Sequence, residues 1–307
     1  MDEVFTGIPS AETWKIVEEI HKGWSADKKY YIQTVDGTEM LLRMSDLSQY
    51  EKKKIEFESM KLLNGIDVPM SRPIEFGLCN NGQSVFSLLT WMEGEDAGEV
   101  IALLSAKEQY LIGVKAGEYL RRIHQVPANH DEQTWSEYYN CKIDKYIANY
   151  KDCGIYLKED QTIMRYVEQN RYLLDDRPNV FQHGDYHLGN MVVTSSGDLG
   201  IIDFNRFDYG DPWEEFNRIS FDASVSEYFA SGRINGYFNH DVPDAFFRLM
   251  ALYLASNQLS SVSWAIPFGE AEVNFMLKRA ANVMEWFDGF QKYVPTWYIP
   301  RFGEIPE

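Results

Sequence analysis

Residues 181–203, FQHGDYHLGNMVVTSSGDLGIID, form the stretch that decides the fold of this chain. Two short apolar runs flank the Ser-Ser-Gly-Asp turn at 195–198, a pattern that predicts a β-hairpin. A polar loop before the first run carries Asp185 and Asn190, and Asp203 stands at the end of the second run. We expect the hairpin to hold these three side chains near one another. Their oxygens are the ligands that a hard cation such as Mg²⁺ prefers.

The length and the charge of the chain limit its class. At 307 residues it has room for one large domain or two ordinary ones, and a hydrophobic content of 45% supports a full core. The 47 acidic residues exceed the 29 basic ones, which gives a formal charge of −18. Such a charge repels nucleic acid and anionic membranes, and it suits either a cationic ligand or simple solubility. We therefore expect no nucleic-acid or membrane partner, and no feature indicates an obligate protein partner.

Apolar runs and cysteine usage predict a cytoplasmic protein. No apolar stretch approaches the roughly 20 residues of a membrane helix, and the acidic start, Met1 to Val4, is unlike a signal peptide. The three cysteines, Cys79, Cys141 and Cys153, cannot all pair and lack metal-site spacing. They are expected to be reduced thiols, as is usual in the cytoplasm.

The first ninety residues combine strand and helix patterns. Apolar residues at helical spacing, after the N-cap candidate Ser10, predict a helix over 10–22. Another helix is expected over 49–63, where Asn64-Gly65 is typical of a C-terminal cap. Four apolar runs joined by glycine-containing turns predict strands over 30–35, 40–44, 72–78 and 84–91. This region is expected to be an antiparallel sheet with one inserted helix.

An acidic, glycine-punctuated segment at 93–98 separates this region from a helical one. Amphipathic patterns predict helices over 106–125, 136–150, 158–174, 212–230, 243–263 and 270–290, the fourth beginning with Pro212. The predicted fold class is α+β, with a small β-rich lobe at 1–92, a hinge at 93–98 and a larger helical lobe at 99–307 that carries the hairpin.

The polar residues of the hairpin region suit phosphoryl transfer. This reaction needs a group that orients the attacking hydroxyl and cations that span the phosphates, and it needs little covalent chemistry. Asp185 would accept the hydroxyl proton, while Asn190 and Asp203 would hold Mg²⁺. The alternative is that these residues belong to an ordinary surface loop, where Asp and Asn are common. The complete arrangement of the three residues around a hairpin favours catalysis.

The segment Gln182 to Met191, continued by Ile201-Ile202-Asp203-Phe204, resembles the signature of the aminoglycoside phosphotransferase and choline kinase superfamily. The resemblance covers most of the chain and implies a bilobal, protein-kinase-like fold whose first lobe binds the nucleotide. It also implies that Asp185 is the catalytic base and that Asn190 and Asp203 are magnesium ligands.

Two further residues are expected to support the catalytic loop. The segment Tyr209 to Trp213 is similar to the family's Gly-Asp-Pro element, which implies that Asp211 braces the loop by hydrogen bonds. Asp211 is also a candidate N-cap for the following helix, and the two roles are compatible. His183 is expected to hold the loop through hydrogen bonds.

The upper lobe departs from the family pattern at one position. The family usually places a lysine on the third strand to grip phosphates, and Arg43 stands in that slot. Arginine offers a rigid, permanently charged fork that suits phosphate. The next helix should supply an acid that pairs with Arg43, and Glu56 is preferred over Glu58. The glycine-poor loop at 23–27 offers the Ser25 hydroxyl and backbone N–H groups to the phosphates.

The segment 88–94 resembles the family's hinge, where adenine bonds to the backbone. Their positions relative to Gly94 in this segment imply that the carbonyl of Thr90 and the N–H of Met92 bond the adenine. Together these features imply ATP or GTP as the phosphoryl donor with Mg²⁺ as cofactor. The sequence does not decide between the two nucleotides.

The acceptor should lie in the helical lobe beside Asp185. A cationic acceptor would need acids, and Asp222, Glu227 and Glu270 are the candidates, although most such acids are solvated helix faces. The leading interpretation is a kinase of a small cationic molecule, with an aminoglycoside antibiotic and hence antibiotic resistance favoured. The alternatives are a metabolic kinase of choline, ethanolamine, homoserine or a sugar, and a non-catalytic nucleotide-binding pseudokinase.

Overall fold

The computed structural model describes residues 3–21, 26–128 and 133–306, and the chain forms two compact units. The first unit consists of residues 1–95 and 191–205, and the second of 96–190 and 206–307. The hairpin at 191–205 therefore groups with the first unit, whereas the prediction placed it in the helical lobe. The two-residue strand β6 (Glu95–Asp96) lies where the chain passes from one unit to the other.

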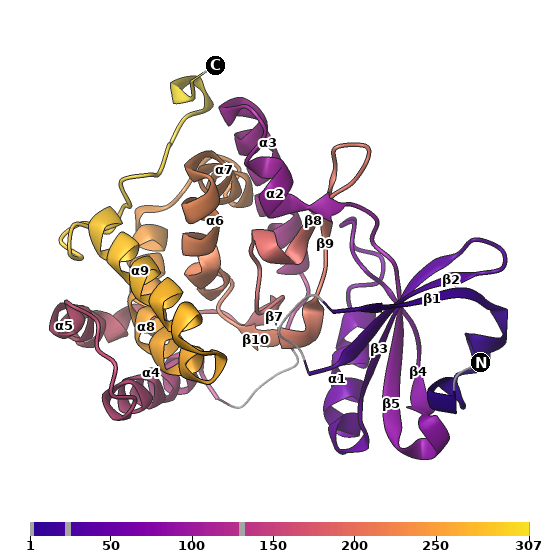
Figure 1. The fold of residues 1–307 in the computed structure, drawn as a ribbon. Coiled ribbons are helices and arrows are strands. Elements are labelled where there is room, and N and C mark those ends of the chain that lie inside the picture. The colour runs from indigo at the N-terminus through magenta and orange to yellow at the C-terminus, as the bar shows by residue number, and fades with distance from the viewer. Residues whose placement is uncertain (1–2, 22–25, 129–132, 307) are drawn as a thin grey trace. The chain divides into compact units, whose positions relative to one another are not determined.

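The first unit is built on a five-stranded antiparallel sheet with the strand order β1-β2-β3-β5-β4 (Figure 1). Its strands are β1 (Trp14–Ile20), β2 (Lys28–Thr34), β3 (Glu39–Asp46), β4 (Pro73–Cys79) and β5 (Ser84–Thr90). The predicted hairpin also forms, as β8 (Met191–Val193) paired with β9 (Leu199–Ile201). Four of the five sheet strands and the hairpin are thus confirmed.

The fifth strand corrects the prediction of a helix over 10–22. Residues Trp14–Ile20 form the edge strand β1, in which Val17 pairs with Ile32 of β2. Apolar residues at positions 14, 17 and 20 satisfy a helical period, but the segment is short and contains three β-branched residues, which pack well on a pleated surface. Pairing with β2 outweighs the weak helical pattern.

Strand β3 positions the predicted phosphate residue. Met40, Leu42 and Met44 are buried in the core with Ile32 and Phe86. Side chains alternate between the faces of a strand, so Arg43 points to the opposite face. Helix α1 (Tyr50–Lys61), predicted at 49–63, packs on β4 and β5, with the rings of Phe57 and Phe76 5.4 Å apart.

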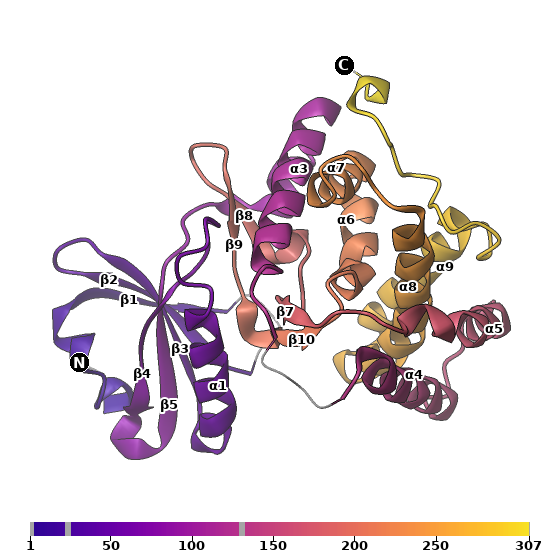
Figure 2. The same ribbon diagram turned by 180° about the vertical axis from the view of Figure 1, so that it is seen from behind.

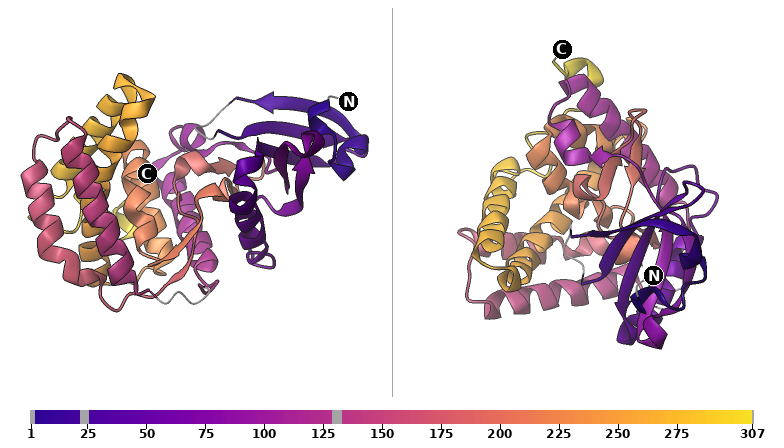
Figure 3. Two further views of the ribbon diagram at one scale, coloured as in Figure 1. Left: turned by 90° about the horizontal axis from the view of Figure 1, so that it is seen from below. Right: turned by 45° about the vertical axis from the view of Figure 1, so that its right-hand side comes forward.

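The second unit is mostly helical, and Figure 3 shows α4 and α5 in magenta and pink beside α8 and α9 in orange and yellow. Its helices are α2 (Ala97–Ile101), α3 (Ala106–Ile123), α4 (Trp135–Asp152), α5 (Asp160–Asn170), α6 (Ile219–Val225), α7 (Glu227–Tyr237), α8 (Asp244–Ala265) and α9 (Glu270–Trp286). Two short strands, β7 (Val180–Gln182) and β10 (Asp208–Gly210), pair antiparallel. In the described ranges, no helix is long and apolar enough to cross a membrane.

One predicted helix is broken into three pieces. The expected helix over 212–230 is a 3₁₀ segment, Glu214–Arg218, followed by α6 and α7. The break falls at Ser226, whose backbone is extended and whose hydroxyl accepts a hydrogen bond from the N–H of Phe229 at 2.9 Å. Ser226 therefore caps a new helix instead of continuing the old one.

Helices α3 and α7 lie side by side at close range (Figure 2). A Cβ added at Gly113 or Gly117 of α3 would collide with backbone atoms of α7. Likewise, a Cβ at Gly232 or Gly236 of α7 would collide with the backbone of α3. Glycines spaced by four residues on both helices thus let the two backbones touch. This contact fixes how α7 lies against α3.

Replacing Gly117 by Ala is expected to destabilise the protein by about 1–3 kcal/mol or more, because the added methyl overpacks a backbone contact. Its Cβ would collide with the carbonyl oxygen of Arg233. Thermal unfolding of purified variants measures the effect. Gly303→Ala is the control, since nothing lies within 4 Å of a Cβ there. Equal melting temperatures for both variants would contradict the proposed tight contact.

Candidate active site

The loop after β7 is shaped by a glycine. Gly184 has a φ of +81°, and a Cβ there would collide with the carbonyl oxygen of Arg206, so only glycine suits the position. The Gly184 N–H donates to Oε1 of Glu215 at 2.9 Å. Glu215 is itself buried, and His124 lies 3.7 Å from its other oxygen. The turn before Asp185 is therefore held by the buried carboxylate of Glu215.

Asp185 is surrounded by two arginines and a histidine. Nε of Arg218 donates to its Oδ1 at 3.1 Å, Nε2 of His187 lies 3.6 Å from Oδ1, and Nη1 of Arg206 lies 3.6 Å from Oδ2. Burial alone would raise the pKa of Asp185, but His187, Arg218 and Arg206 together hold it well below its usual range. The carboxylate is therefore ionised at neutral pH. Among the residues that the structure describes, its Oδ2 has only the 3.6 Å contact to Arg206, so this oxygen can accept a proton from a hydroxyl.

Asn190 is oriented by its own loop. Its Nδ2 donates to the carbonyl oxygen of Asp185 at 2.8 Å, so the amide oxygen points elsewhere. Within the described residues, no donor is bonded to that oxygen, which makes it a suitable hard ligand for a cation. His187 is fixed as well, because the Gly189 N–H donates to its Nδ1 at 3.1 Å and leaves the proton on Nε2, which faces Asp185.

Asp211 anchors the chain on both sides of the loop. Its carboxylate accepts two hydrogen bonds from Arg177, at 2.9 and 2.8 Å, and one from the Tyr253 hydroxyl at 2.6 Å. Its carbonyl oxygen accepts from Nε2 of Gln182 at 2.7 Å. His183, which follows Gln182 in the chain, is fully buried, and its Nδ1 accepts a hydrogen bond from the Asp185 N–H at 3.3 Å. Both predicted supporting residues therefore lie in the network around the loop.

The three predicted acceptor acids do not gather around Asp185. Asp222 is fully buried, with Leu188 N–H donating to Oδ1 at 2.9 Å and Arg233 donating to Oδ2 at 2.6 Å. Both of its oxygens are thus committed inside the protein. Glu227 and Glu270 are exposed first residues of α7 and α9. In the structure Asp222 is therefore a support of the loop, with no oxygen available to an acceptor.

The first unit holds the predicted nucleotide residues. Arg43 is almost buried, and its guanidinium bonds Asp27 through Nε and Nη2 at 3.1 and 2.9 Å, and Asp203 through Nη1 at 2.6 Å. Burial alone would lower the pKa of Arg43, but these two acids raise it. Asp203 keeps about a third of its side chain exposed and has a φ of +66°, an unusual backbone for a residue other than glycine. Its position leaves a carboxylate oxygen for a hard cation.

The expected ion pair between Arg43 and an acid of the following helix is wrong. Glu56 pairs with Lys53 at 2.9 Å, and Glu58 pairs with Lys61 at 2.8 Å. Lys53 also bonds Asp27 at 2.9 Å, so Asp27 takes the place expected for the helix acid. Ser25 lies outside the described residues.

Two basic residues beside Arg43 were missed by the sequence analysis. Lys53 reaches Asp27 from α1, and Lys29 lies opposite Arg43 in the register of β2 and β3. Burial, together with the charge of Arg43, lowers the pKa of Lys29. The predicted hairpin of β2 and β3 places Lys29 opposite Arg43, and this pairing was the sequence feature that could have indicated Lys29. Arg43, Lys29 and Lys53 thus lie close together, with Asp27 bonded to both Arg43 and Lys53, Asp203 bonded to Arg43 and Glu56 bonded to Lys53.

The predicted hinge is packed on the hairpin of the same unit. A Cβ at Gly200 would collide with the Met92 side chain, and one at Gly94 would lie 2.8 Å from the Val193 carbonyl oxygen. Thr90 is paired with Arg72, whose N–H donates to the Thr90 hydroxyl at 2.8 Å. Among the described residues, the Met92 N–H has no backbone acceptor. That N–H remains available for the adenine contact predicted for it.

Replacing Asp27 by Asn is expected to lower the free energy of unfolding at pH 7, with a deficit that shrinks below about pH 4. Burial alone would raise the pKa of Asp27, but Arg43, Ser45 and Lys53 hold it well below its usual range. A carboxylate whose pKa is lower in the folded state than in the unfolded state stabilises the folded protein at pH values above the unfolded pKa. This stabilisation is lost as the pH falls toward the folded pKa. Urea unfolding from pH 7 to 3 measures the deficit. Glu12→Gln, at an exposed position, is the control, and a pH-independent deficit would contradict the ion-pair explanation.

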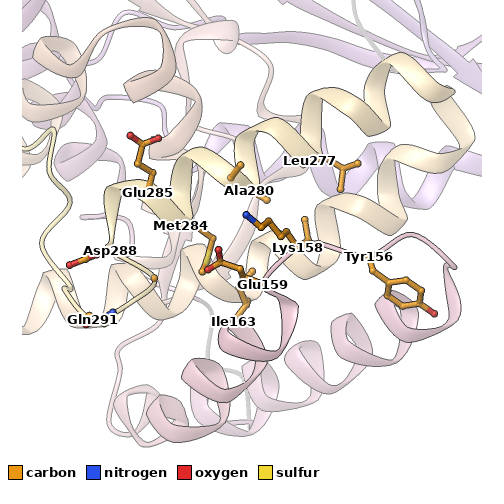
Figure 4. A pocket seen from close by; sticks show the side chains of 13 residues that line it. Tyr156, Lys158, Glu159, Ile163, Leu277, Ala280, Met284, Glu285, Asp288 and Gln291 are labelled. Atoms are coloured by element: carbon orange, nitrogen blue, oxygen red, sulfur yellow. The ribbon is translucent and has the colours of Figure 1, made fainter.

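A cavity of about 760 Å³ lies elsewhere in the second unit, between the start of α5 and the end of α9 (Figure 4). Leu277, Ala280, Met284 and Ile163 form its apolar part, and Lys158 lies at its edge with several acids. None of the residues around Asp185 lines it. This cavity is therefore separate from the loop that carries Asp185.

Comparisons with known proteins agree with this arrangement. The family model described as "Phosphotransferase enzyme family" matches residues 16–247. A comparison with curated proteins finds no match. Among solved structures, aminoglycoside phosphotransferase APH(2'')-Ib with ADP is 16% identical, with a TM-score of 0.62 over 88% of this chain and 94% of that one.

Two further solved structures share the fold. A choline/ethanolamine kinase family protein from Mesorhizobium loti is 14% identical, with a TM-score of 0.67 over 94% of each chain. The GDP complex of wild-type aminoglycoside 2'-phosphotransferase-IIIa is 15% identical, with a TM-score of 0.65 over 90% of this chain and 94% of that one. At these identities the likeness establishes the α+β fold and leaves the acceptor open.

Proposed function

Because the chain belongs to the phosphotransferase enzyme family, we propose that it moves the γ-phosphoryl group of ATP or GTP to a hydroxyl of a small molecule. The observation that carries this proposal is Asp185, an ionised carboxylate on a glycine-fixed loop with one oxygen available to a hydroxyl. Solved structures of the same fold carry ADP or GDP, which supports a nucleotide donor.

In the proposed mechanism, Asp185 Oδ2 orients the acceptor hydroxyl and takes its proton as the oxygen attacks the γ-phosphorus. His187 and Arg218 hold the other carboxylate oxygen and keep Asp185 ionised. Asn190 and Asp203 would each supply an oxygen ligand to Mg²⁺, which, when bound, neutralises charge on the phosphates. Their hard oxygens suit that ion.

The nucleotide would bind to residues of the first unit. Arg43, Lys53 and Lys29 supply cations for the phosphates, with the Thr90 carbonyl and the Met92 N–H as adenine partners. Ser25 stays a prediction for a phosphate contact. Glu56 pairs with Lys53 at 2.9 Å and not with Arg43 as predicted, and it would hold that lysine for the phosphates. We propose residues 1–92 and 93–98 as the nucleotide lobe and hinge, and the cytoplasm as the place of action.

For the acceptor, an aminoglycoside was favoured by the sequence, and choline, ethanolamine, homoserine or a sugar are the alternatives. Only the exposed Glu227 and Glu270 support a polycation, because Asp222 is committed to Arg233. The arginines around Asp185 weigh against a cationic acceptor, since like charges repel.

The test is a panel of these acceptors with both nucleotides, read by acceptor-dependent release of ADP or GDP with and without Mg²⁺. We expect release that requires an acceptor and stops on chelation. Absence of acceptor-dependent release, together with calorimetric failure to bind Mg-nucleotide, would establish a non-catalytic protein and overturn the proposal.

A further inference from the structure

A buried arginine near the catalytic loop lacks an acidic partner. Arg279 of α9 is only 3% exposed. Its guanidinium donates to the Ser220 hydroxyl and, at 3.4 Å, to the sulfur of Met276, while its Nε has no partner among the described residues. No carboxylate of those residues lies within ion-pair distance of it. Burying a cation without a counter-ion is costly, so its retention calls for an explanation.

Arg279 is stacked against the residues that surround Asp185. Its guanidinium carbon lies 3.1 Å from the ring centre of Phe221, and that ring is stacked on His187 with centres 5.1 Å apart. His187 in turn faces Asp185. Burial and the positive charge of Arg218 lower the pKa of Arg279 to about 9. A row of side chains thus connects Arg279 to the catalytic loop.

Arg218, unlike the buried Arg279, is partly exposed beside Asp185. Its side chain is 21% exposed, and only its Nε is used, on Asp185. Within the described residues, its two terminal nitrogens have no hydrogen-bond acceptor. Arg206, which is 44% exposed, also faces Asp185. Two arginines therefore face the carboxylate of Asp185, and Arg279 lies behind the rings of Phe221 and His187.

Nearby acids do not balance this charge, because each is committed elsewhere. Glu214 bonds Lys142 at 3.2 Å, Glu215 accepts from the Gly184 N–H, and Asp222 pairs with Arg233. Asp222 and Glu272 both act on Arg279, but only from beyond ion-pair distance. An anion from outside the chain would satisfy the excess.

We propose that the acceptor of this enzyme carries an anionic group, a carboxylate or a phosphate, beside the hydroxyl that is phosphorylated. The terminal nitrogens of Arg218 bind the anion, and Arg279 acts from behind as a positioning residue that adds positive potential. This inference rests on the proposed function, whose chemistry it leaves unchanged. It replaces the cationic acceptor class that the net charge of −18 suggested.

The first experiment compares acceptors that share a skeleton and differ in charge. Glucose, glucosamine and glucuronate form one set, and glycerol, 3-aminopropane-1,2-diol and glycerate form another. With the full chain, Mg²⁺ and ATP or GTP, we expect the highest kcat/KM for the anionic member of a set. Turnover restricted to neutral or cationic members would overturn the inference while leaving the proposed function intact. Absence of all acceptor-dependent turnover would instead count against the proposed function.

The second experiment uses Arg279→Met, with the exposed Arg248→Met as a matched control. Removing one charge behind the subsite should raise KM for the anionic acceptor about tenfold and change kcat little. Arg279→Lys should restore much of the loss. An equal fall in kcat for every acceptor, with KM unchanged, would assign the arginines to the transferred phosphoryl group and overturn the inference.

A third measurement needs no turnover. Arg279→Met should melt at the wild-type temperature or above, because the apolar side chain replaces an unpaired buried cation. Inorganic phosphate should raise the melting temperature of the wild type and of Arg248→Met more than that of Arg279→Met. An equal phosphate effect on all three proteins would contradict an anion subsite at this place.

Discussion

Replacing Asp185 by Asn is expected to lower kcat by about 10²–10⁴-fold while nucleotide binding is retained. The amide keeps the size of the side chain but cannot take the hydroxyl proton. The predicted nucleotide contacts, Arg43, Thr90 and Met92, lie in the other compact unit, so they are unchanged by the substitution. Steady-state turnover and calorimetric titration of Mg-nucleotide measure the two quantities separately.

The matched control for this variant is Asp244→Asn. Asp244 is an exposed acid in the same unit and pairs with Arg248 at 2.9 Å, much as Asp185 pairs with Arg218. Its substitution should leave kcat within about a factor of two, since an exposed pair contributes little. A kcat for Asp185→Asn as high as that of the control would show that Asp185 is not the base.

Replacing Arg233 by Met is expected to lower the free energy of unfolding by about 3–5 kcal/mol. Arg233 and Asp222 are both fully buried and 2.6 Å apart, so the substitution strands a carboxylate in the core. The guanidinium also stacks between Tyr186 and Phe216, with ring centres at 4.8 Å. A loss of this size should lower the melting temperature by about 6–20 °C.

A double variant separates the ion pair from packing. Arg233→Met with Asp222→Asn removes both charges and keeps an acceptor for the Leu188 N–H. It should recover much of the lost stability, because no charge is left unpaired. The exposed pair of Arg248 and Asp244 is the reference, where Arg248→Met should cost less than about 1 kcal/mol. A double variant no more stable than Arg233→Met would assign the loss to packing alone.

The sequence predicted the parts of this protein that depend on local patterns. The hairpin, the strands β2 to β5 and the long helices follow from short-range apolar periods and turn residues, and all were confirmed. The loop with Asp185 was recognised because several residues of one motif lie close together in the chain. The resemblance drawn from it agrees with the family found for residues 16–247.

What the sequence missed depends on contacts between distant residues. Residues 14–20 fit a helical period and a strand alike, and only pairing with β2 decides between them. Asp27 and Arg43 are separated by 16 residues, and nothing local indicates that Asp27 replaces Glu56 as the partner. Likewise, Asp222 looks like an exposed helix acid until Arg233 is seen beside it. Net charge is a weak guide to the acceptor, because it averages over the whole surface and does not describe the surroundings of Asp185.

The glycine contact between α3 and α7 has a consequence for engineering. The loop that carries Asp185 is anchored to both helices, through the Tyr186 hydroxyl on the Ala116 carbonyl at 2.7 Å and through Asp222, which bonds the Leu188 N–H of the loop and Arg233 of α7. Because α3 and α7 are in backbone contact and both hold the loop, we expect few substitutions on their facing sides to be tolerated. Arg279, by contrast, comes from α9, outside that pair of helices. Directed evolution toward new acceptors should therefore accept substitutions on α9 far more readily than on α3 or α7.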